Sequence, residues 1–387
     1  MKYRRIGDFI EQVKVKNQEG KYGNLLGINI DKYFMPSVAN IIGVNLKRYK
    51  VVKYNQFACN RMHVGRDYRI PMALSQSQEP FIVSPAYTVF GIIDESILLP
   101  DYLMMWFCRP EFDRECWFHT DADVRGGLPW ELFCDIEIPI PSIEKQQEIV
   151  NEYNTITNRI TLNEQLNKKL EETAQAIYKH WFVEEKEKGW EIIKLSEVCN
   201  LITDGKHGDC QNELNSGYYF VSVKDLSNSN IVYDEARQIT KEDFEETHRR
   251  TNLEAGDILL TNAGTIGRLA IVKNSNKTRR TTFQKSVAIL KPNNDVIKSY
   301  YLYLLLKTNI RVIKELAGGS TQSNLLLGDL RNFEFVFPGT KRINDFDITI
   351  TPIFKKIEIT GKEILVLKKM KELLLSKMTK VEIEKEV

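Results

Sequence analysis

Two long stretches of the chain repeat apolar residues at alternating intervals of four and three positions. This spacing predicts two long helices, each with one seam of the kind that pairs in coiled coils. The seam of the first helix comprises Ile149, Tyr153, Ile156, Ile160, Asn163, Asn167, Leu170, Ala174, Ile177 and Trp181. The seam of the second comprises Ile350, Ile353, Ile357, Thr360, Ile364, Leu367, Lys371, Leu374 and Met378. The alternative is that each helix packs only on its own domain, but two similar seams in one chain favour mutual pairing.

Polar residues interrupt both seams, Asn163 and Asn167 in the first and Thr360 and Lys371 in the second. Polar seam residues fix register and partner choice at a cost in stability. A helix of about 35 residues extends roughly 50 Å at 1.5 Å per residue. We therefore expect each helix to act as a spacer.

The segments outside the helices form an approximate internal duplication, because the same landmarks recur in the same order in each half. They are an amphipathic opening (3–10 and 190–198), strand-like runs around a polar turn (57–66 and 257–268), a further strand (80–84 and 282–290), an aromatic-rich helix (101–107 and 299–306), and a Gly-Gly turn leading to a strand that ends in proline (125–141 and 317–338). The predicted order is globular domain (1–141), helix (142–186), globular domain (187–340) and helix (341–387). The predicted fold class is α+β, with an antiparallel helix pair and approximate two-fold symmetry.

Composition agrees with two domains, because 387 residues exceed what one hydrophobic core usually organises. Hydrophobic residues make up 42% and charged residues 27%, a globular balance. The net charge of +2 does not by itself predict a nucleic-acid partner. The first residues lack an apolar signal core, and the longest apolar run, near 300–306, is too short to span a bilayer. We expect no membrane association and a cytoplasmic location.

Catalytic and metal-binding signatures are missing from the sequence. The six cysteines form no C-x-x-C pair, and residues 204–209, which resemble a metal loop, have a composition typical of a turn. Gly264 to Gly267 lack the setting of a dinucleotide fingerprint, and no phosphate-binding loop is present. Residues 84–87 resemble the tetrapeptide of amino-methyltransferases but lack its amide or carboxylate and its second proline. We expect no metal, no bound cofactor and no catalysis in this chain alone.

Four segments carry a resemblance to a known family. Residues 138–149 (IPIPSIEKQQEI) resemble the strand-to-helix junction of the specificity subunits of type I restriction-modification systems, and residues 177–183 (IYKHWFV) resemble the end of their central spacer helix. Residues 57–65 and 262–268 resemble the central stretches of the two target recognition domains of that family. The resemblance covers nearly the whole chain.

The resemblance implies a non-catalytic subunit in which each recognition domain reads one half of a split double-stranded DNA target. It implies that the helices set the gap, that two methylation subunits bind, and that two restriction subunits join where the system has them. S-adenosylmethionine and adenine methylation belong to the methylation subunit, which takes the base out of the stack. Residues 339–348 lack the Glu-Lys-Gln-Gln-Glu run of the first junction. Docking of a methylation subunit is therefore less secure on that side.

Base reading requires Arg or Lys for guanine and Asn or Gln for adenine, on polar turns. The candidates in the first domain are Asn60, Arg61, Arg66, Arg69 and Arg125. Those in the second are Lys206, His207, Asn262, Thr265, Arg268, Gln284 and Lys285, with Arg279 and Arg280 suited to phosphates and Gly319, Thr321 and Gln322 on a loop that permits close approach. A structural role is the competing interpretation for each residue. Two other functions stay open, a methyltransferase or nuclease with divergent motifs and a coiled-coil scaffold.

Overall fold

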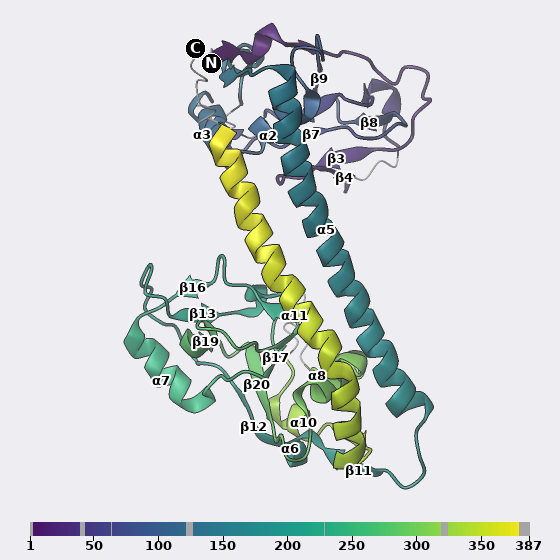
Figure 1. Cartoon of the computed structure of the whole chain (residues 1–387), viewed down its shortest axis with the longest axis vertical. Helices are drawn as coiled ribbons and strands as arrows, with labels where there is room; N and C mark the ends of the chain where they lie inside the picture. Colours follow the sequence, from purple (N-terminus) through teal and green to yellow (C-terminus); the bar gives the residue numbers. More distant parts are fainter. Residues whose placement is uncertain are drawn as a thin grey trace. The chain divides into compact units, whose positions relative to one another are not determined.

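The computed structural model describes residues 3–38, 43–62, 64–120, 127–227, 229–318 and 324–378. The chain divides into two compact units. Unit 1 contains residues 1–163 and 363–387, and unit 2 contains residues 164–362. Both long helices, α5 (Ile143–Lys179) and α11 (Thr340–Lys377), contribute residues to each unit (Figure 1).

Unit 1 is built on a four-stranded antiparallel sheet in the order β2 (Ile10–Gln12), β9 (Thr88–Ile92), β6 (Phe57–Cys59) and β7 (Met72–Leu74). Apolar side chains on these strands form the core, since Phe57 lies opposite Phe90 and their rings stack with centroids 4.9 Å apart. The remaining strands form the antiparallel pairs β1 (Tyr3–Arg5) with β10 (Glu137–Pro139), β3 (Leu26–Ile28) with β4 (Phe34–Pro36), and β5 (Lys50–Val52) with β8 (Phe81–Val83).

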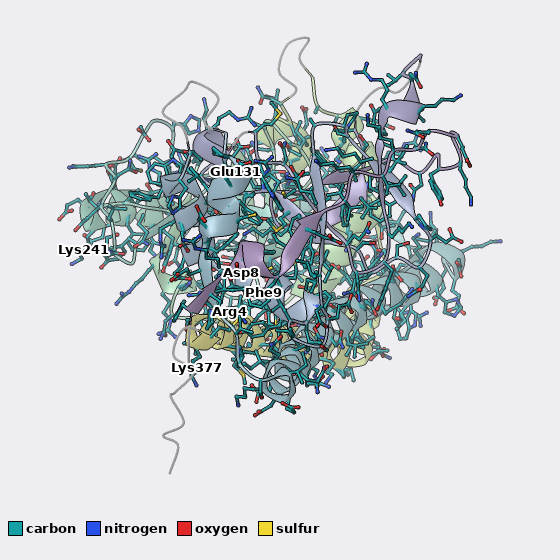
Figure 2. All side chains as sticks on the ribbon, turned by 90° about the horizontal axis from the view of Figure 1, so that it is seen from above. Arg4, Asp8, Phe9, Glu131, Lys241 and Lys377 are labelled. Carbon is teal, nitrogen blue, oxygen red and sulfur yellow. The ribbon has the colours of Figure 1, made fainter. Side chains whose placement is uncertain are left out.

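Short helices close the core of unit 1. They are α1 (Val64–Asp67), α2 (Pro100–Phe107), α3 (Pro110–Phe118) and α4 (Trp130–Asp135), with 3₁₀ turns η1 (Ile6–Asp8) and η2 (Leu46–Arg48). Proline opens α2 and α3, where its missing N–H costs no hydrogen bond. At the start of the chain, Arg4 covers the ring of Phe9 with its guanidinium carbon 4.3 Å from the centroid (Figure 2).

Unit 2 repeats the sheet in the order β12 (Cys199–Asp204), β20 (Val287–Pro292), β17 (Ile258–Thr261) and β18 (Leu269–Ile271). Its other strands are β11 (Glu191–Lys194) paired with β21 (Glu334–Phe337), β13 (Tyr219–Val221) between β16 (Arg237–Gln238) and β19 (Thr281–Phe283), and β14 (Leu226–Ser227) with β15 (Asn230–Ile231). Its helices are α6 (Leu195–Val198), α7 (Lys241–Thr251), α8 (Ser299–Thr308), α9 (Ile310–Glu315) and α10 (Leu327–Arg331), with turns η4 (Val223–Asp225), η5 (Thr278–Arg280) and a π-helical turn at His180–Glu184.

The two units therefore share the order of the main sheet and the pairing of the first and last strands, and the predicted α+β class is confirmed. In each, the opening strand pairs with the strand that precedes the long helix, and the four-stranded sheet has the same order. The predicted strand over 282–290 is instead two strands, β19 and β20, because the chain turns at Gln284 and leaves one sheet for the other. The predicted domain limits stay predictions, as does the two-fold symmetry.

The apolar seams of the long helices lie inside the protein, because every predicted seam residue is buried or half-buried. In unit 1, Lys371 of α11 covers the ring of Tyr153 of α5 at 4.9 Å. In unit 2, Tyr178 of α5 packs on Phe346 of α11 with ring centroids 6.1 Å apart. Trp181, in the π-helical turn after α5, also packs on Phe346, and Arg342 covers the Trp181 ring at 4.5 Å. The segments of α5 and α11 within each unit thus contact one another and run antiparallel. A coiled coil over their full length stays a prediction.

The start of each long helix is fixed in a different way. The side chain of Gln146 is fully buried in unit 1, and its Nε2 donates to the carbonyl oxygens of Ile97 at 2.8 Å and Pro141 at 2.9 Å. Its Oε1 accepts from the backbone N–H of Leu99 at 2.9 Å. At the matching position of α11, Ile343 is fully buried in the core of unit 2. The missing polar run in the second junction thus corresponds to an apolar residue in place of a hydrogen-bonded amide.

A half-buried carboxylate joins α5 to the rest of unit 2. Glu171 Oε1 accepts from the hydroxyl of Tyr303 at 2.5 Å, from the Ser229 hydroxyl, and from Lys307 Nζ at 2.6 Å. Burial alone raises the pKa of Glu171, but the hydrogen bonds from Lys307, Ser229 and Tyr303 outweigh burial and leave the pKa below its ordinary value. These contacts therefore keep the Glu171 carboxylate charged and fix this position of α5 to α8 and to Ser229.

Candidate nucleic-acid interface

The predicted residues of unit 2 gather mostly at one end of its four-stranded sheet, where backbone hydrogen bonds join three turns. The N–H of Lys206 donates to the Phe283 carbonyl at 2.8 Å, and the N–H of Lys285 donates to the Lys206 carbonyl at 3.1 Å. Next along the sheet, the N–H of Asn262 donates to the Ser286 carbonyl at 3.0 Å. Residues far apart in sequence therefore form one continuous edge.

A glycine makes this close approach possible. Gly205 follows β12, and a Cβ there would lie 1.9 Å from the carbonyl oxygen of Phe283. No side chain fits at that distance, so only glycine lets β12 meet the turn between β19 and β20. The turn at residues 204–209 therefore has a structural function within this edge.

Lys206 is held by the chain's own carboxylates. Its Nζ lies 2.9 Å from Asp243 Oδ1 and 2.8 Å from Glu246 Oε2, both on α7. The hydrogen bonds to Asp243 and Glu246 raise the pKa of Lys206, and the bond from Lys206 lowers the pKa of Asp243. His207 Nε2 lies 3.0 Å from Asp204 Oδ2, and the His207 side chain is 63% exposed. His207 is thus accessible to a ligand, whereas Lys206 fastens α7 to the sheet edge.

Asn262 differs from its neighbours because part of its amide is unsatisfied. The residue is 8% exposed, and its Oδ1 is buried with no hydrogen-bond partner among the described residues. Its backbone carbonyl accepts from the N–H of Leu325 at 2.8 Å, directly after the loop that contains Gly319, Thr321 and Gln322. These three predicted residues lie outside the described part of the chain.

The other candidates of unit 2 fall into two groups. Thr265 and Lys285 are exposed and Gln284 is half-buried at the same edge. Arg268 Nη1 donates to the carbonyls of Val223 at 3.0 Å and Leu226 at 3.3 Å, so its guanidinium supports the backbone. The exposed Arg279 and Arg280 lie at the opposite end of β19 from Gln284, and they are not brought to this edge.

In unit 1, Arg61, the second residue after the central strand β6, makes the backbone hydrogen bond that Asn262 makes in unit 2. Its Nε donates to Thr88 Oγ1 at 2.9 Å, its Nη1 donates to the Leu128 carbonyl, and its own carbonyl accepts from the Leu128 N–H at 2.9 Å. The guanidinium also lies 5.8 Å from the ring centroid of Trp130. Arg61 and Asn262 thus both fix the residue that follows a glycine-containing loop, by the same backbone hydrogen bond in each unit.

The remaining candidates of unit 1 are scattered. Asn60 Oδ1 accepts from the N–H of Met62 at 3.2 Å, which makes it a turn residue. Arg66 pairs with the adjacent Asp67 at 2.7 Å, and Arg69 pairs with Asp31 at 3.5 Å. The side chains of both arginines are more than half exposed. Arg125 lies outside the described residues.

Lys50 lies close to Arg61, although no sequence motif indicates it. Lys50 Nζ donates to the carbonyl of Tyr87, and Arg61 binds the next residue, Thr88. Burial lowers the pKa of Lys50, and the positive charges of Arg61, Lys16 and Lys14 lower it further. A count of charges along the first third of the sequence, rather than a search for motifs, is the signal that identifies this group.

The thiols and acids form no further reactive group in the described part of the chain. All six cysteines are free, and burial raises the pKa of the Cys59 thiol to about 12. Within the same residues, no three His, Cys, Asp or Glu side chains come together in an arrangement suited to a metal ion. The helices described here include none with both the length and the apolar character that crossing a membrane requires.

Comparison with known proteins identifies the fold. The family model of the type I restriction modification DNA specificity domain matches residues 187–369. The chain is 25% identical over 284 residues to the type I restriction enzyme MjaIX specificity subunit of Methanocaldococcus jannaschii, which covers 66% of this chain and 64% of that protein. It is 24% identical over 190 residues to the HindI specificity subunit of Haemophilus influenzae, covering 46% and 40% of the two chains.

Among solved structures, the type I restriction-modification S subunit from M. genitalium has a TM-score of 0.53 at 14% identity and aligns over 97% of this chain and 95% of its own. That similarity shows a shared fold. The matched segments span 64% and 40% of the length of the two curated relatives. The predicted resemblance to type I specificity subunits is confirmed.

Proposed function

We propose that this chain, a relative of type I specificity subunits, is the DNA-reading subunit of a type I restriction-modification methyltransferase. Unit 1 reads one half of a split double-stranded target and unit 2 reads the other. The observation that carries the proposal is the repeated sheet. Arg61, two residues after β6, and Asn262, directly after β17, each accept with the backbone carbonyl from the N–H of the leucine that follows a glycine-containing loop. A recognition loop on a rigid sheet is a common arrangement for reading base edges.

The partners follow from the same proposal. Two methylation subunits bind this chain, supply S-adenosylmethionine and methylate an adenine in each half of the target, and restriction subunits join where the system has them. This chain contributes recognition and no catalysis. Because its target is DNA, the proposal also carries the expected cytoplasmic location. The helices α5 and α11 set the gap between the two half-sites.

Within the interface, the proposed readers lie at the sheet edge. In unit 2 these are His207, Asn262, Gln284 and Lys285, together with the loop that holds Thr321 and Gln322. Asn262 is supported by its unsatisfied Oδ1, since a buried acceptor without a partner costs free energy unless a ligand satisfies it. Arg61, Lys206 and Arg268 position the loops, because their side chains already bind backbone or carboxylate groups.

Mapping of methylated adenines across the host genome tests the function. Deleting the gene should abolish methylation at one split motif, and replacing residues 12–141 with the matching segment of a relative should change one half of that motif only. Inserting seven residues into both α5 and α11 keeps both seams and should change the gap while leaving both half-sites intact. An unchanged methylation pattern after deletion, or a change of both halves after the exchange, would contradict the proposal.

A further inference from the structure

Unit 1 contains a strongly basic segment. Residues 13–53 contain eight Lys and Arg residues against two Asp and Glu residues, a net charge of +6, whereas the whole chain carries +2. The remainder of the chain is therefore net negative. A second basic run, residues 258–294 of unit 2, contains seven Lys and Arg residues and no Asp or Glu. Clustered positive charge of this kind attracts a polyanion.

Folding brings part of this segment together. Residues 15–17 run antiparallel beside β5, with the N–H of Val51 donating to the Val15 carbonyl at 2.9 Å and the N–H of Asn17 donating to the Tyr49 carbonyl at 2.9 Å. In this pairing Lys16 lies directly opposite Lys50. Like charges opposite one another on an antiparallel pair are destabilising. Stability therefore does not explain the arrangement.

The charges of the group are not neutralised within the described part of the chain. Lys14 and Lys16 are exposed, and neither they nor Lys50 forms an ion pair with a described carboxylate. The two acids of the segment are Glu19 and Asp31, of which Asp31 pairs with Arg69. We call Lys14, Lys16 and Lys50 the basic patch. Burial and the charges of Arg61, Lys16 and Lys14 lower the pKa of Lys50, so the group is electrostatically coupled.

The patch borders the candidate interface of unit 1. Lys50 Nζ donates to the carbonyl of Tyr87, and Arg61 Nε donates to the hydroxyl of Thr88, at the start of β9. Two cations thus bind successive residues of one strand end. Phosphates flanking a base read near Arg61 would lie within the field of the patch.

We infer that the basic patch of Lys14, Lys16 and Lys50 binds the phosphate backbone of double-stranded DNA beside the half-site read by unit 1. This inference rests on the proposed function and assigns it a contact surface that the predicted residues did not include. Phosphate contacts supply affinity and orientation but no sequence information, because the backbone is the same at every base pair. The patch therefore controls salt-dependent affinity and leaves the recognised sequence unchanged.

The test measures binding of the full-length protein, purified with the subunits that accompany it, to a fluorescent duplex of about 40 base pairs of random sequence. Anisotropy titrations between about 50 and 200 mM KCl give the slope of log K against log salt, which changes by about 0.9 for each phosphate contact. The variant is Lys14→Gln with Lys16→Gln, both exposed. The control is Lys369→Gln with Lys377→Gln, an equal change of charge at exposed positions of α11 (Figure 2 labels Lys377).

The expected result is a slope shallower by about 1.8 for the Lys14/Lys16 variant, the value for two lost phosphate contacts, with no change for the Lys369/Lys377 control. Lys14→Glu with Lys16→Glu should weaken binding further, and the methylated motif in the host should be unchanged. Circular dichroism melting of each variant verifies folding.

Three other outcomes would overturn the inference. Equal slopes for variant, control and wild type would leave the proposed function standing and remove the patch from it. Loss of an accompanying subunit with an unchanged salt slope would identify the patch as a protein contact. No DNA binding by the wild-type assembly would reject the inference together with the proposed function.

Discussion

Replacing Gln146 with Leu is the sharpest test of how the first long helix is fixed to its domain. The substitution keeps the volume nearly constant but leaves the Leu99 N–H and the carbonyls of Ile97 and Pro141 without their partner. Three hydrogen bonds at about 1 kcal/mol each give a loss of about 3 kcal/mol. Water that reaches the carbonyl of Ile97, a residue that is 44% exposed, would offset one of these bonds, so we expect a net loss of about 2 to 3 kcal/mol.

The next residue supplies a matched control. Gln147 is exposed, and its Nε2 donates a hydrogen bond to Asn151 Oδ1, one turn further along α5. Gln147→Leu should change the free energy of unfolding by no more than about 0.5 kcal/mol, as usual for a surface position. For a unit of this size, about 2 to 3 kcal/mol corresponds to a melting temperature lower by about 4 to 12 °C.

Two measurements report the change in stability. Calorimetry gives the melting temperature of each variant, and hydrogen exchange of peptides covering α2 reports the local consequence, because Leu99 is the N-cap of that helix. We expect hydrogen exchange in α2 to be faster than wild type for Gln146→Leu and unchanged for Gln147→Leu. Equal stability of Gln146→Leu and wild type, or an equal loss in both variants, would refute the structural function assigned to the buried amide.

Three further predictions concern the cores. Ile343→Gln should destabilise unit 2 by about 2 to 4 kcal/mol, since it buries an amide at a fully enclosed apolar position, and a calorimetric melt unchanged from wild type would contradict this. The pKa of Glu171 is lower in the folded state than its ordinary value of 4.5. The stabilisation that the charged Glu171 provides is therefore present above pH 4.5 and is lost as the pH falls through the folded pKa. Urea unfolding between about pH 6 and pH 3 should show a weaker pH dependence for Glu171→Gln than for wild type. With a pKa of about 12 and no exposed surface, the Cys59 thiol should resist iodoacetamide at about pH 8 in the native protein and react in urea, as peptide mass mapping would show; rapid native labelling would be inconsistent with its burial.

The long helices and the duplication could be predicted from sequence because both are periodic over many residues. Each long helix begins shortly after a strand and a proline, as the pattern indicates: α5 begins four residues after Pro139, and α11 begins two residues after Pro338. Helix α7 was not predicted, since it is strongly polar and has only Phe244 as a buried apolar side chain. Its N-terminus was nevertheless encoded, because the side chain of Thr240 accepts from the N–H of Asp243 as an N-cap.

The candidate interface was harder to predict, because its partners are distant in sequence. Lys206 meets Asp243 and Glu246 of α7, and Arg61 meets Leu128, 67 residues away. Residue type and a polar turn in the sequence identify a candidate cation. They do not show that its N–H groups already donate hydrogen bonds to acceptors elsewhere in the fold. Asn262 was singled out for its amide, and the structure adds that its Oδ1 is buried without a described partner.

The antiparallel pairing that closes each globular part has a genetic consequence. Tyr3 lies opposite Pro139, and Glu191 lies opposite Phe337, so the first and last strands of each part enter and leave side by side. A segment whose ends meet in the fold can be exchanged as a cassette, because recombination at the two gene positions that encode these ends leaves the helices and the other part intact. New specificities can then arise by shuffling whole modules between genes, without the slow accumulation of point mutations in a working reader.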